Sequence, residues 1–201
     1  MDGVTELGWG SLETPVGQVS VACTDAGVAR VTYGPPPGPG PVLGTPASVL
    51  LDAALEELQE YFGGRLRSFS VPVDLGTAHG PRRTVLSLLH GTVGFGQTIT
   101  YGALAARAGV EATAGPGGTV PPARVVGQVM ASNPVALIVP CHRVVAGTGL
   151  GGYSGGTGTD VKRWLLVFEG AIPATLDWDP AGLRRLPAAA REPQPAGPAS
   201  T

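Results

Sequence analysis

The sequence predicts a mixed α/β protein of the α+β type, with strands near its N-terminus and helices after them. Two β-rich runs flank a turn within residues 15–33, and five helical patterns follow between residues 48 and 169. A length of 201 residues allows one or two domains. Gly and Pro together contribute 52 residues, yet 43% of the chain is hydrophobic, so we expect Gly and Pro to gather in loops and tails around a smaller core.

The first predicted element is a β-hairpin over residues 15–33. Its two runs flank Thr24-Asp25-Ala26-Gly27, and Asp and Gly are typical of hairpin turns. Residues 34–46 then read GPPPGPGPVLGTP. Because Pro fixes φ and removes a backbone donor, this segment is predicted to be a mobile loop.

A helix is predicted after residue 48, with Ser48 as its N-cap. Apolar residues recur there at helical spacing and acidic residues occupy the other face. Gly63-Gly64 is expected to end the helix. Residues 69–75 read as an extended segment, and Pro72 favours a place at the edge of a sheet.

Three helices are predicted in the next part of the chain, over residues 82–90, 100–108 and 123–132. Thr100 is the expected N-cap of the second helix. The second and third helices resemble a helix-turn-helix, although the Gly/Pro loop between them, residues 109–122, exceeds the usual turn of three or four residues. The pattern alone therefore favours a plain helical hairpin.

The remaining segments surround a cysteine. Residues 135–139 are apolar and predict a buried strand or core segment that ends at Pro140-Cys141-His142-Arg143. Residues 147–158 form a glycine-rich loop, and residues 161–169 a helix with Trp164, Leu165 and Phe168 toward the core. Residues 187–201 have the composition of a disordered tail.

Charge is distributed unevenly along the chain. Residues 1–80 hold three basic and nine acidic residues, a net charge of −6, whereas residues 81–170 hold seven basic and three acidic residues, a net charge of +4. Such asymmetry is a weak indication of a nucleic-acid surface. An acidic helix face beside an ordinary basic surface explains the same numbers, and no dense basic run is present.

The cysteine count limits the class of protein. Cys23 and Cys141 cannot build a disulfide scaffold, and neither lies in a zinc-binding spacing, so no metal site is expected. We see no secretory signal in the N-terminal residues and no apolar stretch of about 18 residues that would span a membrane. The sequence therefore indicates a cytoplasmic protein with reduced thiols and no membrane partner.

Cys141 is the candidate nucleophile. Pro140 and the apolar run before it predict a held backbone and dry surroundings, which alone would leave a thiol protonated and inert. A histidine such as His142, acting through water and oriented by a carboxylate such as Glu169, would activate the thiol. A buried cysteine beside a surface histidine is the simpler interpretation of that pair taken by itself.

Several segments in the same order resemble the O6-alkylguanine-DNA alkyltransferases, the methylated-DNA–protein-cysteine methyltransferase family. They are Asn133-Pro134, VALIVPCHRVV at 135–145, GGYSGG at 151–156 and KRWLLVFEG at 162–170. FGQTITYGALAARAG at 95–109 and ARVVGQVMASNP at 123–134 are similar to the Thr-Tyr-Gly segment and recognition helix of that family. The loop at 109–122 is longer than the family pattern.

The resemblance implies a small N-terminal domain of sheet and helix over residues 1–78. A winged-helix-like helix-turn-helix catalytic domain would follow over residues 79–172, and a Pro/Ala-rich tail over 173–201. The implied activity is direct-reversal DNA repair. The protein would flip O6-alkylguanine out of double-stranded DNA from the minor groove and transfer the alkyl group irreversibly to its own cysteine, once per molecule. It would act as a monomer without a cofactor or metal, in the cytoplasm and at the nucleoid when bound to DNA.

The same resemblance implies roles for the catalytic residues. Cys141 would be the acceptor, His142 the base acting through water, and Glu169 the carboxylate that completes the relay. Tyr101 would donate a proton toward the departing guanine and contact the DNA phosphate. Asn133 would orient the active-site turn.

DNA-binding and pocket residues follow from the resemblance as well. Arg124 would enter the base stack in place of the flipped nucleotide, with Ala123 and Gly127 beside it on the recognition helix. Tyr153 would form a wall of the guanine pocket. Val144 and Ser154 would line the same pocket through their backbone groups. Arg143 fits a structural salt bridge better than a catalytic role.

Two other functions remain open from the sequence. An alkyltransferase-like protein could bind damaged DNA without repairing it, although such proteins lack the cysteine that this chain has at Cys141. A thiol hydrolase could use Cys141, His142 and Glu169, but it would leave Tyr101 and Arg124 unexplained.

Overall fold

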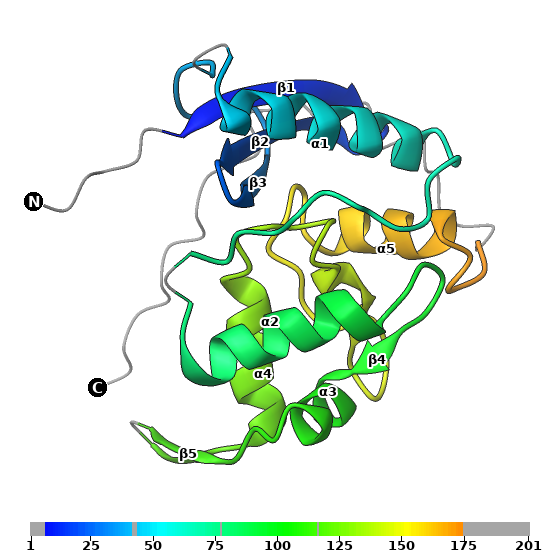
Figure 1. The fold of residues 1–201 in the computed structure, drawn as a ribbon. Coiled ribbons are helices and arrows are strands. Elements are labelled where there is room, and N and C mark those ends of the chain that lie inside the picture. The colour runs from blue at the N-terminus through cyan, green and yellow to red at the C-terminus, as the bar shows by residue number, and fades with distance from the viewer. Residues whose placement is uncertain (1–6, 42–43, 77, 116, 175–201) are drawn as a thin grey trace, which may run out of the picture.

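The computed structural model describes residues 7–41, 44–76, 78–115 and 117–174 (Figure 1). A three-stranded sheet and one helix form an N-terminal layer, and four helices form a second part of the molecule beneath it in the view of Figure 1. The chain is therefore α+β, as expected. The run predicted to be disordered, residues 187–201, lies outside the described residues.

In chain order the elements are β1 (Gly8–Thr14), β2 (Gly17–Thr24), β3 (Gly27–Tyr33), α1 (Pro46–Phe62), α2 (Gly80–Thr92), β4 (Ile99–Thr100), α3 (Tyr101–Arg107), β5 (Thr113–Gly115), β6 (Gly118–Val120), α4 (Pro122–Ala131), η1 (Cys141–Arg143), β7 (Val144–Val145) and α5 (Thr159–Phe168). All the predicted helices are present. In the described part of segment 34–46, the backbone is a loop until α1 begins at its last residue.

The N-terminal sheet is antiparallel, in the order β1-β2-β3. The predicted hairpin is β2 and β3, which pair up to Thr24 and Gly27 at the turn. Strand β1 was not predicted, because its glycines interrupt the alternation that marks a strand. One of them, Gly10, lies directly under α1, where an added Cβ would come within 2.8 Å of Leu55. The glycine therefore allows the helix to lie close to the sheet.

Helix α1 begins earlier than predicted. Thr45 is its N-cap, and the Thr45 side chain accepts a hydrogen bond from the backbone N–H of Ser48 at 3.2 Å. The prediction of Ser48 as the N-cap is wrong because Pro46, at the first helical position, already has the φ that a helix requires. Ser48 lies instead in the first turn, where its hydroxyl donates to the carbonyl of Thr45 at 2.8 Å.

The extended segment over residues 69–75 lies beside β3. Val73 forms a parallel bridge with Val28, and the N–H of Val28 donates to the carbonyl of Pro72 at 2.8 Å. Pro72 contributes only its carbonyl to this pairing, so the backbone N–H that proline lacks is not needed here. This part of the prediction is confirmed.

The loop predicted over residues 109–122 contains regular structure. Strands β5 and β6 form a short antiparallel hairpin within it. Gly115 ends β5 and Gly118 begins β6, and glycine is typical of such turns. The strands were not predicted because the segment is rich in Gly and Pro. Helices α3 and α4, which precede and follow the hairpin in the chain, nevertheless pack against each other.

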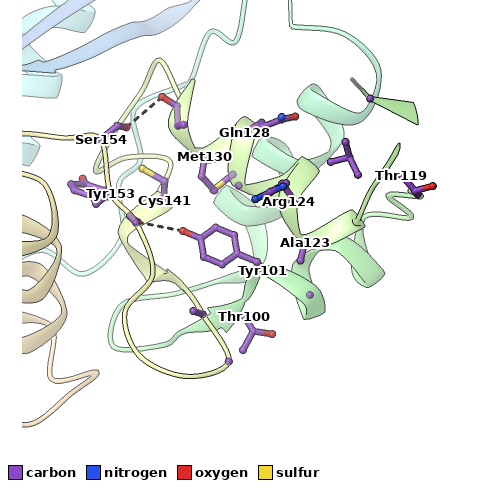
Figure 2. A pocket seen from close by; sticks show the side chains of 18 of the residues that line it. Thr100, Tyr101, Thr119, Ala123, Arg124, Gln128, Met130, Cys141, Tyr153 and Ser154 are labelled. Atoms are coloured by element: carbon purple, nitrogen blue, oxygen red, sulfur yellow. Dashed lines mark hydrogen bonds between the residues drawn. The ribbon is translucent and has the colours of Figure 1, made fainter. Parts of the chain in front are cut away.

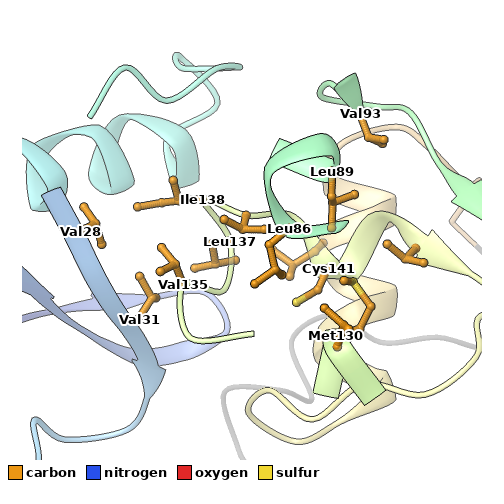
Figure 3. Close-up of a cluster of buried hydrophobic side chains, with 14 of the residues drawn as sticks. Val28, Val31, Leu86, Leu89, Val93, Met130, Val135, Leu137, Ile138 and Cys141 are labelled. Carbon is orange, nitrogen blue, oxygen red and sulfur yellow. The ribbon is translucent and has the colours of Figure 1, made fainter. Parts of the chain in front are cut away.

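Residues 135–139 are a core segment rather than a strand. Val135 alone bridges to Val31 of β3, and the chain then turns, with Leu137 at a φ of 71°. Figure 3 shows Val28 and Val31 of the sheet facing Val135, Leu137 and Ile138 of this segment, which in turn contact α2. One continuous hydrophobic core therefore joins the N-terminal layer to the helical part.

No helix within the described ranges has the length and apolar character needed to cross a membrane.

Candidate active site

A cavity of about 1210 Å³ opens between α3, the β5–β6 hairpin, α4, the Cys141 turn and the glycine-rich loop (Figure 2). Seven of the predicted site residues line it: Tyr101, Ala123, Arg124, Gly127, Cys141, Tyr153 and Ser154. The chain brings these residues together from positions 101 to 154, so the cavity is the candidate functional site. The other predicted residues lie behind its wall.

The backbone at Cys141 is held by short-range hydrogen bonds. Cys141 begins the 3-10 turn η1, and its N–H donates to the carbonyl of Val139 at 2.8 Å. Asn133 donates through Nδ2 to the same carbonyl at 2.9 Å and accepts from the N–H of Val135 through Oδ1 at 3.1 Å. The Asn133 side chain therefore clamps the segment that leads into the cysteine.

Cys141 is buried, with only 6% of its surface exposed. Burial raises the pKa of Cys141, while hydrogen bonds from Asn133 and Tyr153 and the charge of Lys162 act in the opposite direction. The net shift is upward, so the resting thiol is protonated at neutral pH. A nucleophilic role therefore requires a base.

His142 is the candidate for that base. Its ring is fully buried, and Nε2 lies 2.9 Å from Oε1 of Glu169. Burial lowers the pKa of His142, although the Glu169 carboxylate raises it in part, so the ring is neutral at pH 7. A carboxylate partner places the proton on Nε2, which leaves a lone pair on Nδ1, and no described protein atom hydrogen-bonds Nδ1.

Glu169 is the centre of a buried network. Besides His142, its carboxylate accepts from Arg143 through two nitrogens, at 2.8 and 2.9 Å, and from the N–H of Gly96 at 3.3 Å. Burial alone would raise the pKa of Glu169, but the hydrogen bonds from His142 and Arg143 outweigh it and lower the pKa below its ordinary value. Arg143 also donates to the carbonyl of Val93 at 2.7 Å. Arg143 thus forms the structural salt bridge that we expected.

Tyr61 is a member of this network that the sequence reasoning missed. It belongs to α1 of the N-terminal layer, is 1% exposed, and donates its hydroxyl to Oε1 of Glu169 at 2.7 Å. The helical pattern placed Tyr61 on the apolar face. A buried tyrosine hydroxyl requires a hydrogen-bond partner, and that requirement was the signal available in the sequence.

Lys162 is a second residue that the sequence reasoning missed. It is the only lysine in the chain, is fully buried, and donates to the carbonyls of Val144 at 2.7 Å and Gly152 at 3.0 Å. Its ammonium also lies 5.7 Å from the ring centre of Tyr101. Burial lowers the pKa of Lys162 to about 8, with a smaller opposing effect from Cys141.

The carbonyl of Val144 therefore already accepts one hydrogen bond. Its side chain is fully buried, and Val144 is not among the residues that line the cavity. A carbonyl has two lone pairs, so a second donor can still bind it. The fully buried lysine thus ties strand β7 to the glycine-rich loop.

The glycine-rich loop lies against Tyr101. The Tyr101 hydroxyl donates to the carbonyl of Gly152 at 3.3 Å (Figure 2). Gly151 has a φ of +71°, and an added Cβ there would come within 2.9 Å of the Tyr101 ring. Burial raises the pKa of Tyr101, so its hydroxyl keeps its proton. Ser154, also in this loop, donates to the carbonyl of Ala131 at 3.3 Å.

Arg124 lies on the exposed side of the cavity. Together with Ala123 and Gly127 it lines one face of α4, as their helical spacing requires. Its side chain is exposed and has no hydrogen bond or ion pair with another described residue. The longer loop before α4 therefore does not separate Arg124 from Tyr101 and Cys141.

The cavity thus places a buried cysteine, with a histidine–glutamate pair beside it, next to two packed helices, one of which carries an exposed arginine. This is the arrangement of a candidate cysteine nucleophile beside a helix-turn-helix-like unit. Comparison with known proteins identifies the class. The DNA-binding domain model of 6-O-methylguanine DNA methyltransferase matches residues 81–171, and the ribonuclease-like domain model matches residues 7–75.

Individual relatives agree with these matches. The Mycobacterium tuberculosis methylated-DNA–protein-cysteine methyltransferase is 34% identical over 79% of this chain and 90% of its own length. The Homo sapiens protein of the same name is 32% identical over 85% of this chain and 84% of its own. The crystal structure of Mycobacterium tuberculosis OGT in complex with DNA superposes with a TM-score of 0.65 at 31% identity, covering 81% of this chain and 92% of that one.

The chain therefore belongs to the 6-O-methylguanine DNA methyltransferase family.

Proposed function

We propose that this protein repairs alkylated DNA by direct reversal and that Cys141 takes the alkyl group. The observation that carries the proposal is the arrangement of Cys141 in the cavity with His142 and Glu169 behind it. The family and the named relatives support the reaction class, methyl transfer from DNA to a protein cysteine. We further propose O6-alkylguanine in double-stranded DNA as the substrate.

The proposed chemistry begins with deprotonation of Cys141. A water molecule between the thiol and Nδ1 of His142 would carry the proton, and Glu169 would stabilise the imidazolium that forms. The sulfur then attacks the alkyl carbon, so that an S–C bond forms and the O6–C bond of guanine breaks. Tyr101 donates a proton toward the departing guanine.

The product is a thioether on Cys141 and unmodified guanine. A thioether has no hydrolytic route back to the thiol, so each molecule reacts once and needs no cofactor or metal.

DNA would approach the open side of the cavity. We propose that α4 enters the minor groove, with Ala123 and Gly127 close to the backbone and Arg124 in place of the flipped base. Tyr153 would form a wall of the base pocket and Ser154 would bind the base through its backbone. Unpairing and unstacking a base costs a few kcal/mol, and a side chain that fills the gap offsets part of that cost.

The proposal extends to organisation and location. We propose domains over residues 1–78 and 79–172 with a tail over 173–201, which the two family-model matches support. The protein would act as a monomer. The reaction requires a reduced thiol and access to the genome, which supports a cytoplasmic location, at the nucleoid when DNA is bound.

The test is incubation with a duplex that contains one O6-methylguanine, followed by intact-mass measurement and peptide mapping. We expect the protein to gain one methyl group, located on Cys141, and Cys141→Ala to gain none. Cys23→Ala is the matched control, because Cys23 is the other free cysteine and its thiol is buried in the N-terminal sheet. Binding of the duplex without any methyl gain by the wild type would instead favour a damage-binding protein that does not repair.

A further inference from the structure

A pair of tyrosines joins the N-terminal sheet to the wall of the cavity. Tyr33 is the last residue of β3, and Tyr153 belongs to the glycine-rich loop, 120 positions later. Their hydroxyl oxygens are 2.9 Å apart, and their rings meet edge to face at 76°, with centres 6.4 Å apart. The N-terminal layer therefore contacts the pocket directly.

The loop is shaped to receive Tyr33. A Cβ added at Gly155 would come within 2.5 Å of the Tyr33 ring and 2.7 Å of the Tyr153 ring. A Cβ at Gly156 would lie 3.3 Å from the Tyr33 ring, at a φ of +53° that side chains rarely adopt. Only glycine fits beside the tyrosine pair at these two positions.

The pair leads to the nucleophile. Tyr153 and Cys141 line the same cavity and are neighbours in Figure 2, and Tyr153 is among the groups that lower the pKa of Cys141. Burial raises the pKa of both tyrosines, so each keeps its proton and can donate one hydrogen bond. Either hydroxyl of the pair can be the donor in the resting protein. A thiolate can only accept, so once Cys141 is deprotonated Tyr153 would donate to the sulfur, and the Tyr153 oxygen would then accept from Tyr33.

The strand that carries Tyr33 is fixed to the site at a second point. The N–H of Val31 donates to the carbonyl of Pro134 at 2.8 Å, next to the Asn133 clamp. A single strand of the N-terminal sheet thus contacts both segments that flank Cys141. Its position sets the position of the Tyr33 hydroxyl.

We propose that Tyr33 is a positioning residue that orients Tyr153 so that the Tyr153 hydroxyl donates to the Cys141 thiolate. The proposal rests on the proposed function in taking Cys141 as the reacting group. Among the described residues, the other titratable or charged groups around this sulfur are Lys162 on α5, Tyr101 on α3 and His142, the next residue in the chain. Tyr33→Phe removes the hydroxyl and leaves all of them unchanged.

The experiment measures the thiol directly. In a Cys23→Ala background Cys141 is the only thiol, so its rate of alkylation by iodoacetamide across the pH range gives its pKa without DNA. We expect Tyr33→Phe to raise the pKa of Cys141 by about half a unit, and to slow methyl transfer at neutral pH about threefold. Tyr153→Phe should have a larger effect, and adding Tyr33→Phe to it should change nothing further.

An unchanged pKa in Tyr33→Phe, or effects of the two substitutions that add, would overturn the proposal. A merely structural role would lower the thermal midpoint without moving the pKa, and that result also counts against it. The proposed function is tested separately. A wild type that takes no methyl group from DNA, but whose thiol pKa follows Tyr33, would remove the function and leave this inference standing.

Discussion

The segments matched by the two family models contribute differently to the site. The C-terminal segment, residues 81–171, supplies the thiol, the base, the carboxylate and the exposed arginine. The N-terminal segment, residues 7–75, supplies two neutral hydroxyls, those of Tyr61 and Tyr33. A segment that carries excess negative charge thus reaches the site without bringing charge to it. The comparison teaches that the proposed reacting groups come from one segment and that part of their hydrogen-bonded surroundings comes from the other.

Substitution of Glu169, where the two segments meet, is expected to reduce stability and methyl transfer the most. Glu169→Gln removes the charge that Arg143 and His142 pair with, and breaking a buried pair costs about 3–5 kcal/mol of unfolding free energy. Methyl transfer should fall by at least ~100-fold, because the base loses its partner. Denaturant unfolding and single-turnover kinetics measure both effects. Asp160→Asn, an exposed carboxylate on α5, is the control and should change neither.

Substitution of Arg124 tests the proposed DNA-binding role of the open side of the cavity. Arg124→Ala should slow transfer from duplex DNA by about 10–100-fold, because nothing fills the gap left by the flipped base. Transfer from free O6-methylguanine should be unaffected, since no base pair must open. Arg107→Ala removes the same charge from an exposed position outside the cavity and serves as the control. Equal losses on duplex and free base would contradict the proposed role.

Substitution of Lys162 tests whether the buried ammonium of the C-terminal segment favours the Cys141 thiolate. Lys162→Met removes the ammonium that favours the thiolate, and methyl transfer at neutral pH should fall about tenfold.

The same residue predicts a pH dependence of stability. The folded protein holds the pKa of Lys162 at about 8, below the ordinary 10.5, so between these values only the unfolded chain binds the proton. Wild-type stability relative to Lys162→Met should therefore rise with pH from about 8 to 10.5, by up to about 3 kcal/mol. Urea unfolding of both proteins across this range measures the difference, and a constant difference would contradict the assignment.

Substitution of Tyr61, through which α1 hydrogen-bonds Glu169, is expected to reduce methyl transfer the least. Tyr61→Phe removes one hydrogen bond to a charged group and should cost about 1.5–3 kcal/mol of unfolding free energy. Transfer should slow only a few-fold, because Arg143 and Gly96 still hold the carboxylate. Thermal unfolding and single-turnover kinetics of the same preparation test this. A loss of transfer as large as that of Glu169→Gln would mean that the N-terminal segment shares in the chemistry itself.

Much of the fold followed from local pattern. The turn at Thr24–Gly27 and the cap at Thr100 each depend on residues whose preferences act over a few positions. The start of α1 was misplaced because two capping residues, Thr45 and Ser48, lie three positions apart and Pro46 decides between them. The hairpin β5–β6 was missed because its strands are short and rich in glycine.

Some residues of the site were likewise predicted from the sequence and others were missed. The resemblance identified Cys141 and the residues that share its cavity, because the family pattern lies in contiguous segments of the sequence. Tyr61 and Tyr33 were missed because their partners lie more than 100 positions away, and no local pattern encodes such a contact. Lys162 was missed because its burial depends on the packing of α5.

The burial of that single lysine has a practical consequence. The folded protein presents no lysine amine to solvent, so reagents that acylate amines should not modify its side chains. Modification of Lys162 then requires that α5 separate from β7 and the glycine-rich loop. The residue is a built-in probe of local opening beside the reactive cysteine, and its rate of acylation reports how often that region opens.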